Sequence, residues 1–422
     1  MKILVCSGAG DGAWMVWKLQ HDGHDVQWCV DDDKYRDLLA GLIPPPVDSI
    51  THPADYELIV FDCCCDGAIA DGLREHTPVI GSSSFAEKLE LDRKFGIEFM
   101  EKCGIPVPPW QEFSDVADAI HFIKEKKKRY VFKPSGDVAD KATTYVSKSA
   151  EDMVKYLEIL FKRTRISDFI LQEVIEGTEV STDGWFNGTE FCYFGHTLEE
   201  KKFMAGGIGP NTGCSGNLVW MPTRPDTLFE RGLRRATEAL RGTGFVGPID
   251  LNTIVTEGEL YGLEWTPRFG YEGTCNTIRL IPSDFGEFMY TIATGGTPAP
   301  VAPTYPFSAT VRVTIPPYPS EAKPKKHGGI PINGIDPDKL DAWYVMDLRV
   351  KEGMEGELET VGVSGLVGAP IGCGESPEQA FFECQKAIDQ TQIPDAQYRK
   401  DVAKCCGRRY QELLKNGWLR SI

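Results

Sequence analysis

The sequence lacks several features that would assign it to a common functional class. It contains no run of about 18 predominantly apolar residues, so no membrane-spanning helix is predicted. The N-terminus, MKILVCSGAG, passes from a short apolar segment into a Gly-rich turn and has no signal-peptide pattern. The formal net charge is −17 at pH 7, which argues against binding to a nucleic acid polymer, because that requires a basic surface. We therefore expect a cytoplasmic protein with neither a membrane nor a nucleic acid as its partner.

Metal-binding cysteine modules are also missing. The chain has 13 cysteines and 7 histidines, but the cysteines form no paired CxxC modules and the histidines are scattered. Cys63, Cys64 and Cys65 are consecutive and follow an apolar segment. This irregular spacing argues against a zinc site and favours reduced thiols.

The length and composition indicate a globular protein of several domains. A chain of 422 residues could form two or three hydrophobic cores. Its hydrophobic content of 41% and charged content of 25% are ordinary for such proteins. Proline-rich stretches near 106–109 and 298–306 indicate linkers. They suggest domains over residues 1–95, 96–300 and 301–422.

The first domain is predicted to open with a strand, a Gly-rich turn, a helix and a second strand. The apolar run 2–6 is followed by Gly8, Gly10 and Gly12, and then by a helical pattern. Glycines at such a turn allow backbone amides to approach an anion at the helix N-terminus. The spacing matches a dinucleotide-binding fingerprint poorly, so a simple tight turn explains these glycines equally well.

A β-hairpin is predicted over residues 249–265, with its turn at 257–258. The pairing brings Glu264 roughly opposite Asp250, and directly opposed residues have Cβ atoms about 5 Å apart. Two carboxylates so close repel each other unless a cation lies between them, and Mg²⁺ is bound by one or two carboxylates together with substrate phosphates. A solvated acidic hairpin end explains the pattern equally well.

Other elements follow from periodicity and turn signals. We expect a long helix over 85–102, a strand over 130–133, and a loop over 134–145 that forms a lid. A helix over 149–162, a hairpin over 179–197, a helix over 227–241, and two closing helices over 376–391 and 395–416 complete the prediction.

Several motifs, in order along the chain, carry a resemblance to a known family. They are VFK at 131–133 with Gly136 and Lys141, EVIEGTE at 173–179, GPNTG at 209–213, and EWTPRFG at 264–270. The chain contains no GxxxxGK[ST] phosphate loop, so a nucleotide would be held by other means. These motifs resemble those of the ATP-grasp superfamily and, within it, of the phosphoribosylamine–glycine ligase family of purine biosynthesis.

The resemblance implies a mixed α/β and α+β fold. Residues 1–95 would form an N-terminal α/β domain of the pre-ATP-grasp type. Residues 96–300 would form a two-part ATP-grasp core, with a small lobe over about 106–180 and a large lobe over about 181–300. Residues 301–422 would form a β-rich C-terminal domain with terminal helices.

It also implies roles for particular residues. ATP would be bound by Arg93, Lys133, Lys141, Glu173, Val174, Ile175 and Glu179. The substrates would be bound by Gly8, Gly10, Gly12, Lys201, Pro210, Asn211, Thr212 and Gly213. Asp250, Glu264 and Thr266 would bind Mg²⁺ or Mn²⁺, and Arg268 and Lys141 would be catalytic. Lysines would neutralise phosphate oxygens as point charges.

Three departures from the family pattern concern these sites. Thr266 stands where the family has a metal-binding Asn, and a hydroxyl is the weaker ligand. Arg93 replaces a helix lysine. The charged triplet that follows the first glycines in the family is absent, and Trp14 lies nearby instead. Phosphoribosylamine is therefore predicted to be a poor acceptor, because charge-assisted bonds worth about 1.5–3 kcal/mol each are lost.

The resemblance implies a carboxylate–amine ligase in which ATP phosphorylates a carboxylate and an amine then displaces phosphate. Glycine or another small amino acid is the favoured carboxylate, because GPNTG is retained. Three alternatives remain: a ligase with a different amine acceptor such as a modified nucleotide, an ATP-grasp kinase, and a non-catalytic ATP-binding protein. The partners would be small molecules, and a monomer is favoured.

Overall fold

The N-terminal part of the chain forms a parallel four-stranded sheet. The structure, a computed structural model, describes residues 1–135, 144–163, 168–281, 283–299, 302–320 and 322–420. The sheet has the order β2-β1-β3-β4 and consists of β1 (Lys2–Ser7), β2 (Asp25–Val30), β3 (Leu58–Phe61) and β4 (Val79–Ile80). Helices α1 (Ala13–His21) and α2 (Gly67–Arg74) lie in its connections. The central strands β1 and β3 are almost wholly buried, as expected for a parallel sheet. The predicted strand–turn–helix–strand opening is confirmed.

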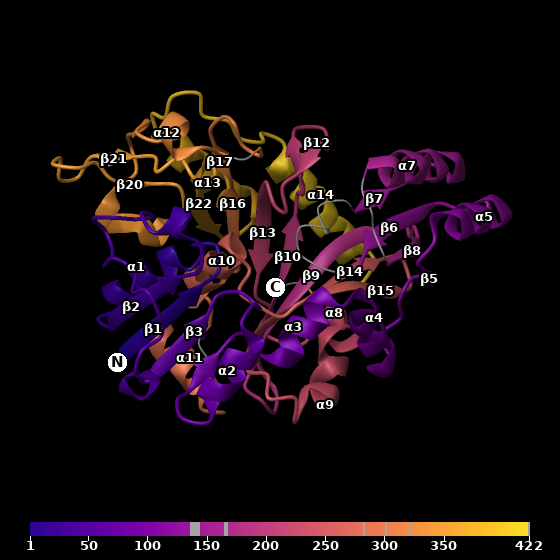
Figure 1. Ribbon diagram of the computed structural model, residues 1–422, viewed down its shortest axis with the longest axis horizontal. Helices are drawn as coiled ribbons and strands as arrows, with labels where there is room; N and C mark the ends of the chain where they lie inside the picture. Colours follow the sequence, from indigo (N-terminus) through magenta and orange to yellow (C-terminus); the bar gives the residue numbers. More distant parts are fainter. Residues whose placement is uncertain (136–143, 164–167, 282, 300–301, 321, 421–422) are drawn as a thin grey trace.

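A second, antiparallel sheet belongs to a small lobe at the right of Figure 1. Its order is β5-β8-β6-β7, with β5 (Trp110–Phe113), β6 (Tyr130–Pro134), β7 (Tyr145–Val146) and β8 (Phe169–Glu173). Helices α5 (Val116–Lys126) and α7 (Ala150–Arg163) pack on it. The lobe has its own core, in which Ile123, Phe132, Leu157 and Phe169 are fully buried. It can therefore keep its shape independently of the main core.

The largest sheet has nine strands and runs through the centre of the molecule. Its order is β15-β14-β9-β10-β13-β16-β22-β17, and β19 also pairs with β22. The strands are β9 (Thr178–Phe186), β10 (Phe191–Glu199), β13 (Gly216–Trp220), β14 (Gly247–Val255), β15 (Leu260–Thr266), β16 (Phe307–Val311), β17 (Val313–Thr314), β19 (Trp343–Val345) and β22 (Leu366–Gly374). The sheet continues from β13 into β16 and so crosses the expected boundary at 300/301. The division into three domains stays a prediction, and a single sheet contains strands from both sides of its second boundary.

Smaller elements surround this sheet. A hairpin joins β11 (Lys202–Met204) and β12 (Ile208–Asn211), and β18 (Pro331–Ile332), β21 (Leu358–Glu359) and β20 (Arg349–Val350) form a three-stranded sheet. Further α-helices are α10 (Glu272–Leu280), α11 (Phe285–Ala293), α12 (Pro324–His327), α13 (Pro377–Asp389) and α14 (Val402–Lys415). Helix α14 begins seven residues after its expected start at 395.

Two of the expected long helices are interrupted. The helix expected over 85–102 is split into α3 (Ser84–Leu91) and α4 (Arg93–Lys102). Asp92 lies between them in an extended conformation, and its carboxylate accepts a hydrogen bond from the amide of Phe95 at 2.9 Å. An N-cap of this kind starts a new helix. The helix expected over 227–241 is likewise divided at Gly232 into α8 (Thr227–Arg231), a 3-10 turn (Leu233–Ala236) and α9 (Thr237–Leu240).

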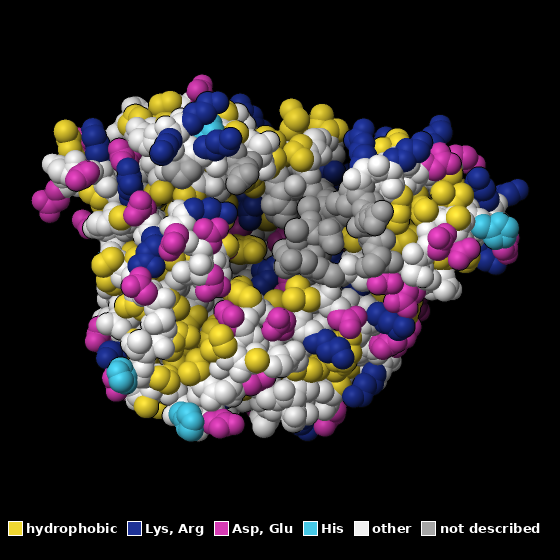
Figure 2. Space-filling model, in the orientation of Figure 1, with side chains coloured by type: hydrophobic (Ala, Val, Ile, Leu, Met, Phe, Trp, Pro, Cys, Tyr) yellow, Lys and Arg dark blue, Asp and Glu magenta, His cyan; other side chains and the backbone are white. Residues whose placement is uncertain are grey.

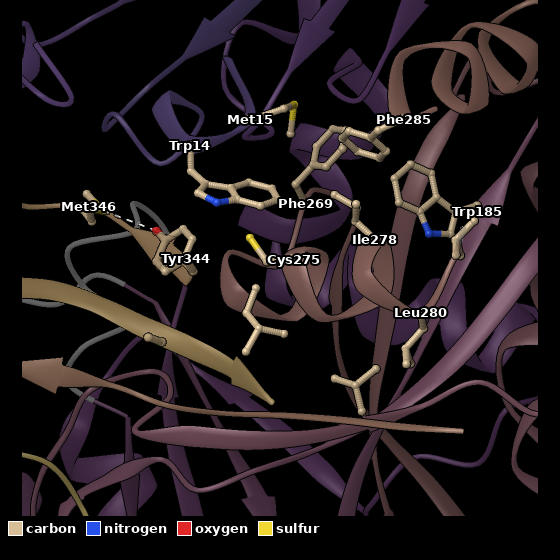
Figure 3. Packing of buried hydrophobic residues seen from close by; sticks show 14 of the residues in the cluster. Trp14, Met15, Trp185, Phe269, Cys275, Ile278, Leu280, Phe285, Tyr344 and Met346 are labelled. Carbon is tan, nitrogen blue, oxygen red and sulfur yellow. Dashed lines mark hydrogen bonds between the residues drawn. The ribbon is translucent and has the colours of Figure 1, made fainter. Parts of the chain in front are cut away.

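The N-terminal sheet and the large sheet share one hydrophobic core. Trp14 and Met15 of α1 belong to the same buried cluster as Phe269, Ile278 and residues of the central strands. Figure 3 shows Trp14 and Met15 approaching α10 from the side of the N-terminal domain. This packing fixes the Gly-rich turn before α1 against the end of the β14–β15 hairpin.

The expectation of reduced thiols throughout is wrong at one place, because Cys63 and Cys65 form a disulfide. The other eleven cysteines form no disulfide in the structure. Within the described ranges, none of the helices has both the length and the apolar character needed to cross a bilayer. The cytoplasmic location stays a prediction.

Candidate active site

The predicted metal-binding hairpin is present, but its register differs from the expected one. Asp250 pairs with Thr266, and Asn252 pairs with Glu264. The expectation that Glu264 lies opposite Asp250 is therefore wrong by two residues. A β-bulge between Asn252 and Thr253 shifts the register by one residue, so that Glu264 faces Asn252 and not Leu251. These four side chains still share one face of the sheet, and diagonal neighbours have Cα atoms about 7–8 Å apart.

The polar row continues onto the neighbouring strand β9. Asp183 lies opposite Asp250, and Ser181 lies opposite Asn252. The amide of Asn252 donates a hydrogen bond of 2.8 Å to Glu179. Asn252 and Asp183 were not among the predicted site residues. The signal for Asn252 was its period-2 spacing from Asp250, whereas only strand pairing could reveal Asp183.

Three basic side chains converge on this acidic face from different elements. The guanidinium of Arg93, at the start of α4, lies 2.7 Å from Glu264. The ammonium of Lys133, at the end of β6, donates to the carbonyl of Leu263 at 3.1 Å. Lys201, just after β10, pairs with Glu179 at 2.7 Å. The structure thus brings together five residues that were predicted to belong to the site, namely Arg93, Lys133, Glu179, Lys201 and Glu264.

The pKa values of these groups show how strongly they interact. Burial opposes the ionisation of Glu264, but Arg93, Lys201 and Lys133 hold its pKa well below the usual range. Burial lowers the pKa of Lys133 to about 8, although Glu264 opposes this shift. Burial lowers the pKa of Lys201, but the charges of Glu179, Glu264 and Glu199 together outweigh this effect and raise its pKa. The cluster is therefore charged at neutral pH, and it presents ammonium groups suited to phosphate oxygens.

Asp250 lies in a different electrostatic environment from Glu264. Burial and the charge of Asp183 raise the pKa of Asp250 well above its ordinary value. Burial also raises the pKa of Glu199 to about 7, and Lys201 only partly opposes this. Asp250 and Glu199 thus hold a proton more readily than exposed carboxyl groups do, as expected for neighbouring buried carboxylates.

The residues present fit a hard divalent cation. Glu264, Asp250, Asn252 and Thr266 offer oxygen atoms on one face, and Mg²⁺ needs only one or two carboxylates beside substrate phosphates. In the described part of the chain, only Asp31, Cys65 and Asp66 form a group of three His, Cys, Asp or Glu ligand atoms that are mutually close. Since Cys65 is bonded to Cys63, its sulfur is not a thiolate ligand in this state. The predicted set of Asp250, Glu264 and Thr266 stays a prediction, with Asn252 as an additional candidate.

The GPNTG segment forms the return strand of the β11–β12 hairpin and the turn after it. Residues 208–211 are exposed, and the amide of Thr212 donates to the carbonyl of Lys201 at 2.9 Å. The Thr212 carbonyl accepts a hydrogen bond of 2.9 Å from Arg312. Arg312 is buried and also pairs with Glu272 at 2.5 Å. The base of the loop carrying Pro210, Asn211 and Gly213 is thus held to the large sheet at two points, although sequence reasoning had not singled out Arg312.

The strand predicted to contact adenine ends at the edge of the small lobe. Glu173 pairs with Lys128 at 2.6 Å. The amide of Val174 donates to the carbonyl of Arg129 at 3.1 Å, so this donor is already bonded within the chain. The adenine-binding roles of Glu173, Val174 and Ile175 remain predictions. Lys141 and most of the expected lid over 134–145 lie outside the described residues.

Arg268 and the glycines of the N-terminal turn form a second group of predicted site residues. Arg268 connects this group to the basic cluster, because it is close to Glu264 in the chain. Arg268 follows Glu264 by four residues, a span of at most about 14 Å, and its Nε donates to Glu90 at 3.3 Å. Its charge acts on Asp11 and Asp62, which lie at the turn containing Gly8 and Gly12. The structure therefore places Arg268 between the basic cluster and the N-terminal turn.

The charge on the surface agrees with small-molecule chemistry. On the face shown in Figure 2, acidic and basic side chains are interspersed. On this face, the described residues form no broad basic track of the kind that a nucleic acid backbone requires.

Comparisons with known proteins agree with the fold and the site. Residues 91–274 match the family model described as phosphoribosylglycinamide synthetase, ATP-grasp (A) domain. A phosphoribosylamine–glycine ligase from Leifsonia xyli is 25% identical over 427 residues, which cover 96% of this chain and 99% of the relative. The human trifunctional purine biosynthetic protein adenosine-3 is 26% identical over 430 residues, covering 95% of this chain and 41% of that protein.

The solved structures support the same fold. The crystal structure of phosphoribosylamine–glycine ligase from Thermotoga maritima superposes with a TM-score of 0.72 at 22% identity, covering 95% of this chain and 100% of the other. A biotin carboxylase from Campylobacter jejuni, solved with an ATP analogue, gives a TM-score of 0.62 at 15% identity, covering 99% and 97%. The fold and the site define an ATP-grasp protein. Within that superfamily, residues 91–274 match the ATP-grasp domain of phosphoribosylglycinamide synthetases, and the chain as a whole is similar to phosphoribosylamine–glycine ligases.

Proposed function

We propose that the chain is an ATP-dependent carboxylate–amine ligase that joins glycine or another small amino acid to an amine and releases ADP and phosphate. The observation that carries this proposal is the convergence of Arg93, Lys133 and Lys201 on the acidic face of β14 and β15. Such a site can neutralise the phosphates of ATP beside carboxylates that bind a divalent cation. The comparisons support the same class of reaction.

The first chemical step transfers the γ-phosphoryl group to the carboxylate of the amino acid. Two anions must meet, so most of the catalysis consists of positioning and charge neutralisation. Lys133 and Lys201 would contact phosphate oxygens, and Glu264 with Asp250 or Asn252 would hold Mg²⁺. Magnesium, when bound there, would neutralise the negative charge that develops on the phosphates. Arg268 would steady the transferred phosphoryl group.

The second step is attack of the uncharged amine on the acyl carbon. The C–N bond forms, the bond from the acyl carbon to the phosphate oxygen breaks, and inorganic phosphate leaves. The amine nitrogen then releases its proton. The GPNTG loop, held by Arg312 and Lys201, would position the amino acid. Exclusion of water during this step prevents hydrolysis of the acyl phosphate.

The test is acyl phosphate formation measured without any natural acceptor. With ATP, Mg²⁺, glycine and hydroxylamine, the protein should form glycine hydroxamate together with ADP. A kinase whose product is not an acyl phosphate would release ADP without hydroxamate, and a non-catalytic protein would bind Mg·ATP without releasing ADP. Either result, across the small amino acids, would disprove the proposal.

A binding control uses two adjacent lysines. Lys201 is paired with Glu179 in the site, whereas Lys202 begins the β11 strand. At about 100 times its dissociation constant, Mg·ATP should stabilise the fold by about 2.7 kcal/mol. Lys201→Met should lose most of this stabilisation in a thermal melt, and Lys202→Met should keep it.

A further inference from the structure

A small hollow lies where the N-terminal turn meets α10 and β19. Its wall includes Asp11, Asp62, Trp14, Tyr271 and Tyr344, and its internal volume is about 20 Å³. Trp14, Tyr344 and Cys275 of α10, which are labelled in Figure 3, belong to this wall. A single water molecule needs roughly 10–15 Å³ of such space. The hollow can therefore take a group of one or two heavy atoms, such as an ammonium group, but not a phosphate group with five.

Two backbone amides of the glycine turn, those of Gly8 and Gly12, are already bonded within the chain. The amide of Gly8 donates to a carboxylate oxygen of Asp62 at 3.3 Å, and the amide of Gly12 donates to the hydroxyl of Ser7 at 3.2 Å. That hydroxyl in turn donates to the other carboxylate oxygen of Asp62. A side chain built on Gly12 would place its Cβ 2.9 Å from Asp62. The carboxylate of Asp62 thus occupies the position that an anionic ligand would take.

The charges around the hollow also disfavour an anion. Asp62 is buried, and Asp11 accepts a hydrogen bond of 3.0 Å from the hydroxyl of Tyr344. Among the described residues, no Lys, Arg or His side chain lines the hollow. The nearby guanidinium of Arg268 is paired with Glu90. Two carboxylates consequently face the hollow, and no basic side chain in its wall neutralises them.

Burial has measurable consequences for both carboxyl groups. It raises the pKa of Asp11 to about 7, and the charge of Asp62 adds to this shift. It raises the pKa of Asp62 to about 6, although Ser7, Gly8 and Gly12 oppose the shift through hydrogen bonds. A bound cation would favour the ionised form of both groups. Aromatic faces such as those of Trp14 and Tyr344 also attract cations.

We infer that this hollow binds the acceptor substrate, and that the acceptor is a small amine carrying a second, cationic group and no phosphate. The inference rests on the proposed ligase function, whose acceptor site it specifies. Asp11 and Asp62 provide the counter-charges for the ammonium group. Phe269 and Tyr271 belong to the wall of the hollow, and Arg268 lies beside them. Arg268 follows β15, the strand predicted to bind the metal, so the hollow is close in the chain to that strand.

Three amines with the same reactive group and spacer test the charge preference. Ethylenediamine, ethanolamine and phosphoethanolamine each present a primary amine and two carbons, and they carry a cationic, neutral or anionic second group. Because this group also changes the basicity of the reacting amine, each rate is expressed per concentration of the uncharged amine. The value of kcat/KM for glycine-dependent ADP release should fall at least tenfold at each step of this series, or about 1.4 kcal/mol per step. Equal or better turnover of phosphoethanolamine would overturn the inference, as would phosphoribosylamine exceeding every cationic amine.

The glycine hydroxamate assay separates this inference from the function on which it rests. If hydroxamate forms but the cationic amine is not preferred, the ligase function stands and the acceptor inference is wrong. If no hydroxamate forms with any small amino acid, both are wrong.

A charge-removing variant and a matched control locate the preference. Asp11→Asn should reduce the ratio of kcat/KM for ethylenediamine over ethanolamine by about tenfold, and this ratio is insensitive to a general loss of folded protein. Asp33→Asn removes a charge from the same region of the chain at a side chain that is 94% exposed, and it should leave the ratio unchanged. An unchanged ratio in Asp11→Asn would show that the hollow does not distinguish acceptors by their charge.

Discussion

The guanidinium of Arg93 lies 2.7 Å from the carboxylate of Glu264, although 171 residues separate them in the chain. Arg93 begins helix α4 and is itself buried, whereas the Glu264 side chain is about one-third exposed at 35%. The contact therefore joins the helix after the N-terminal domain to the strand predicted to bind metal. It holds Glu264 ionised in a position that a divalent cation can reach from the open side.

Removing the charge of Glu264 should abolish most of the activity. Glu264→Gln keeps the size of the side chain but weakens its binding to a cation, so the turnover number should fall by roughly 10² or more. The measurement is ADP release at saturating ATP and glycine over a range of Mg²⁺ concentrations. Glu259→Gln is the control, because Glu259 lies on the same hairpin and pairs with Arg231 at the surface. Normal turnover in Glu264→Gln would remove Glu264 from the metal site.

Binding of ATP should weaken as the pH rises above about 8. The pKa of Lys133 is lowered to about 8, and only its protonated form attracts phosphate. The affinity should thus be constant below pH 8 and fall about tenfold per pH unit above it. Calorimetric titration of the protein with Mg·ATP between pH 7 and 9.5 measures this slope.

The variant Lys133→Arg provides the control for this pH dependence. Arginine keeps its charge throughout this range, so the slope above pH 8 should disappear even if the affinity at pH 7 is lower. A slope that is identical in both proteins would show that another group controls the binding.

The buried pair of Arg312 and Glu272 should be a major contributor to stability near the GPNTG loop. Both side chains are nearly inaccessible, and two hydrogen bonds of 2.5 and 2.9 Å join them. Glu272→Ala leaves the guanidinium buried without its counter-charge, so the free energy of unfolding should fall by about 3–5 kcal/mol. Urea denaturation measures the change.

An exposed pair serves as the comparison for this variant. Arg279 and Asp341 lie 2.6 Å apart at the surface, where an ion pair contributes less than about 1 kcal/mol. Asp341→Ala should therefore cause only a small loss. A loss in Glu272→Ala no larger than that in Asp341→Ala would show that the buried pair is not stabilising.

The thiol count should reveal the Cys63–Cys65 disulfide. Of the 13 cysteines in the sequence, 11 lie outside the disulfide in the structure. Protein denatured without a reducing agent should therefore react with 11 equivalents of a thiol reagent, and with 13 after reduction. Cys63→Ser should give 12 equivalents under both conditions. Thirteen reactive thiols before reduction would contradict the disulfide.

Local patterns in the sequence predicted the elements that depend on neighbouring residues. The hairpin of β14 and β15, the strand–turn–helix opening and the helix after Ser149 were all correct, because alternation, turn residues and caps are read over a few positions. The helix expected over 85–102 failed at Asp92, where a competing cap outweighed the helical periodicity. The resemblance to ATP-grasp proteins was likewise confirmed, since it rests on motifs that occur in the right order.

The sequence by itself thus determined the class of protein and most of the residues that meet in the candidate site. Only the tertiary structure decided how they meet. The register of the β14–β15 pair, with its β-bulge, placed Glu264 beside Asn252 instead of Asp250, and strand pairing brought Asp183 to Asp250. Pairing of β3 with β1 placed Asp62 beside the glycine loop, and packing of the N-terminal turn against α10 brought two carboxylates around one hollow. Register and long-range packing depend on contacts between residues distant in the chain, and such contacts have no local signature in the sequence.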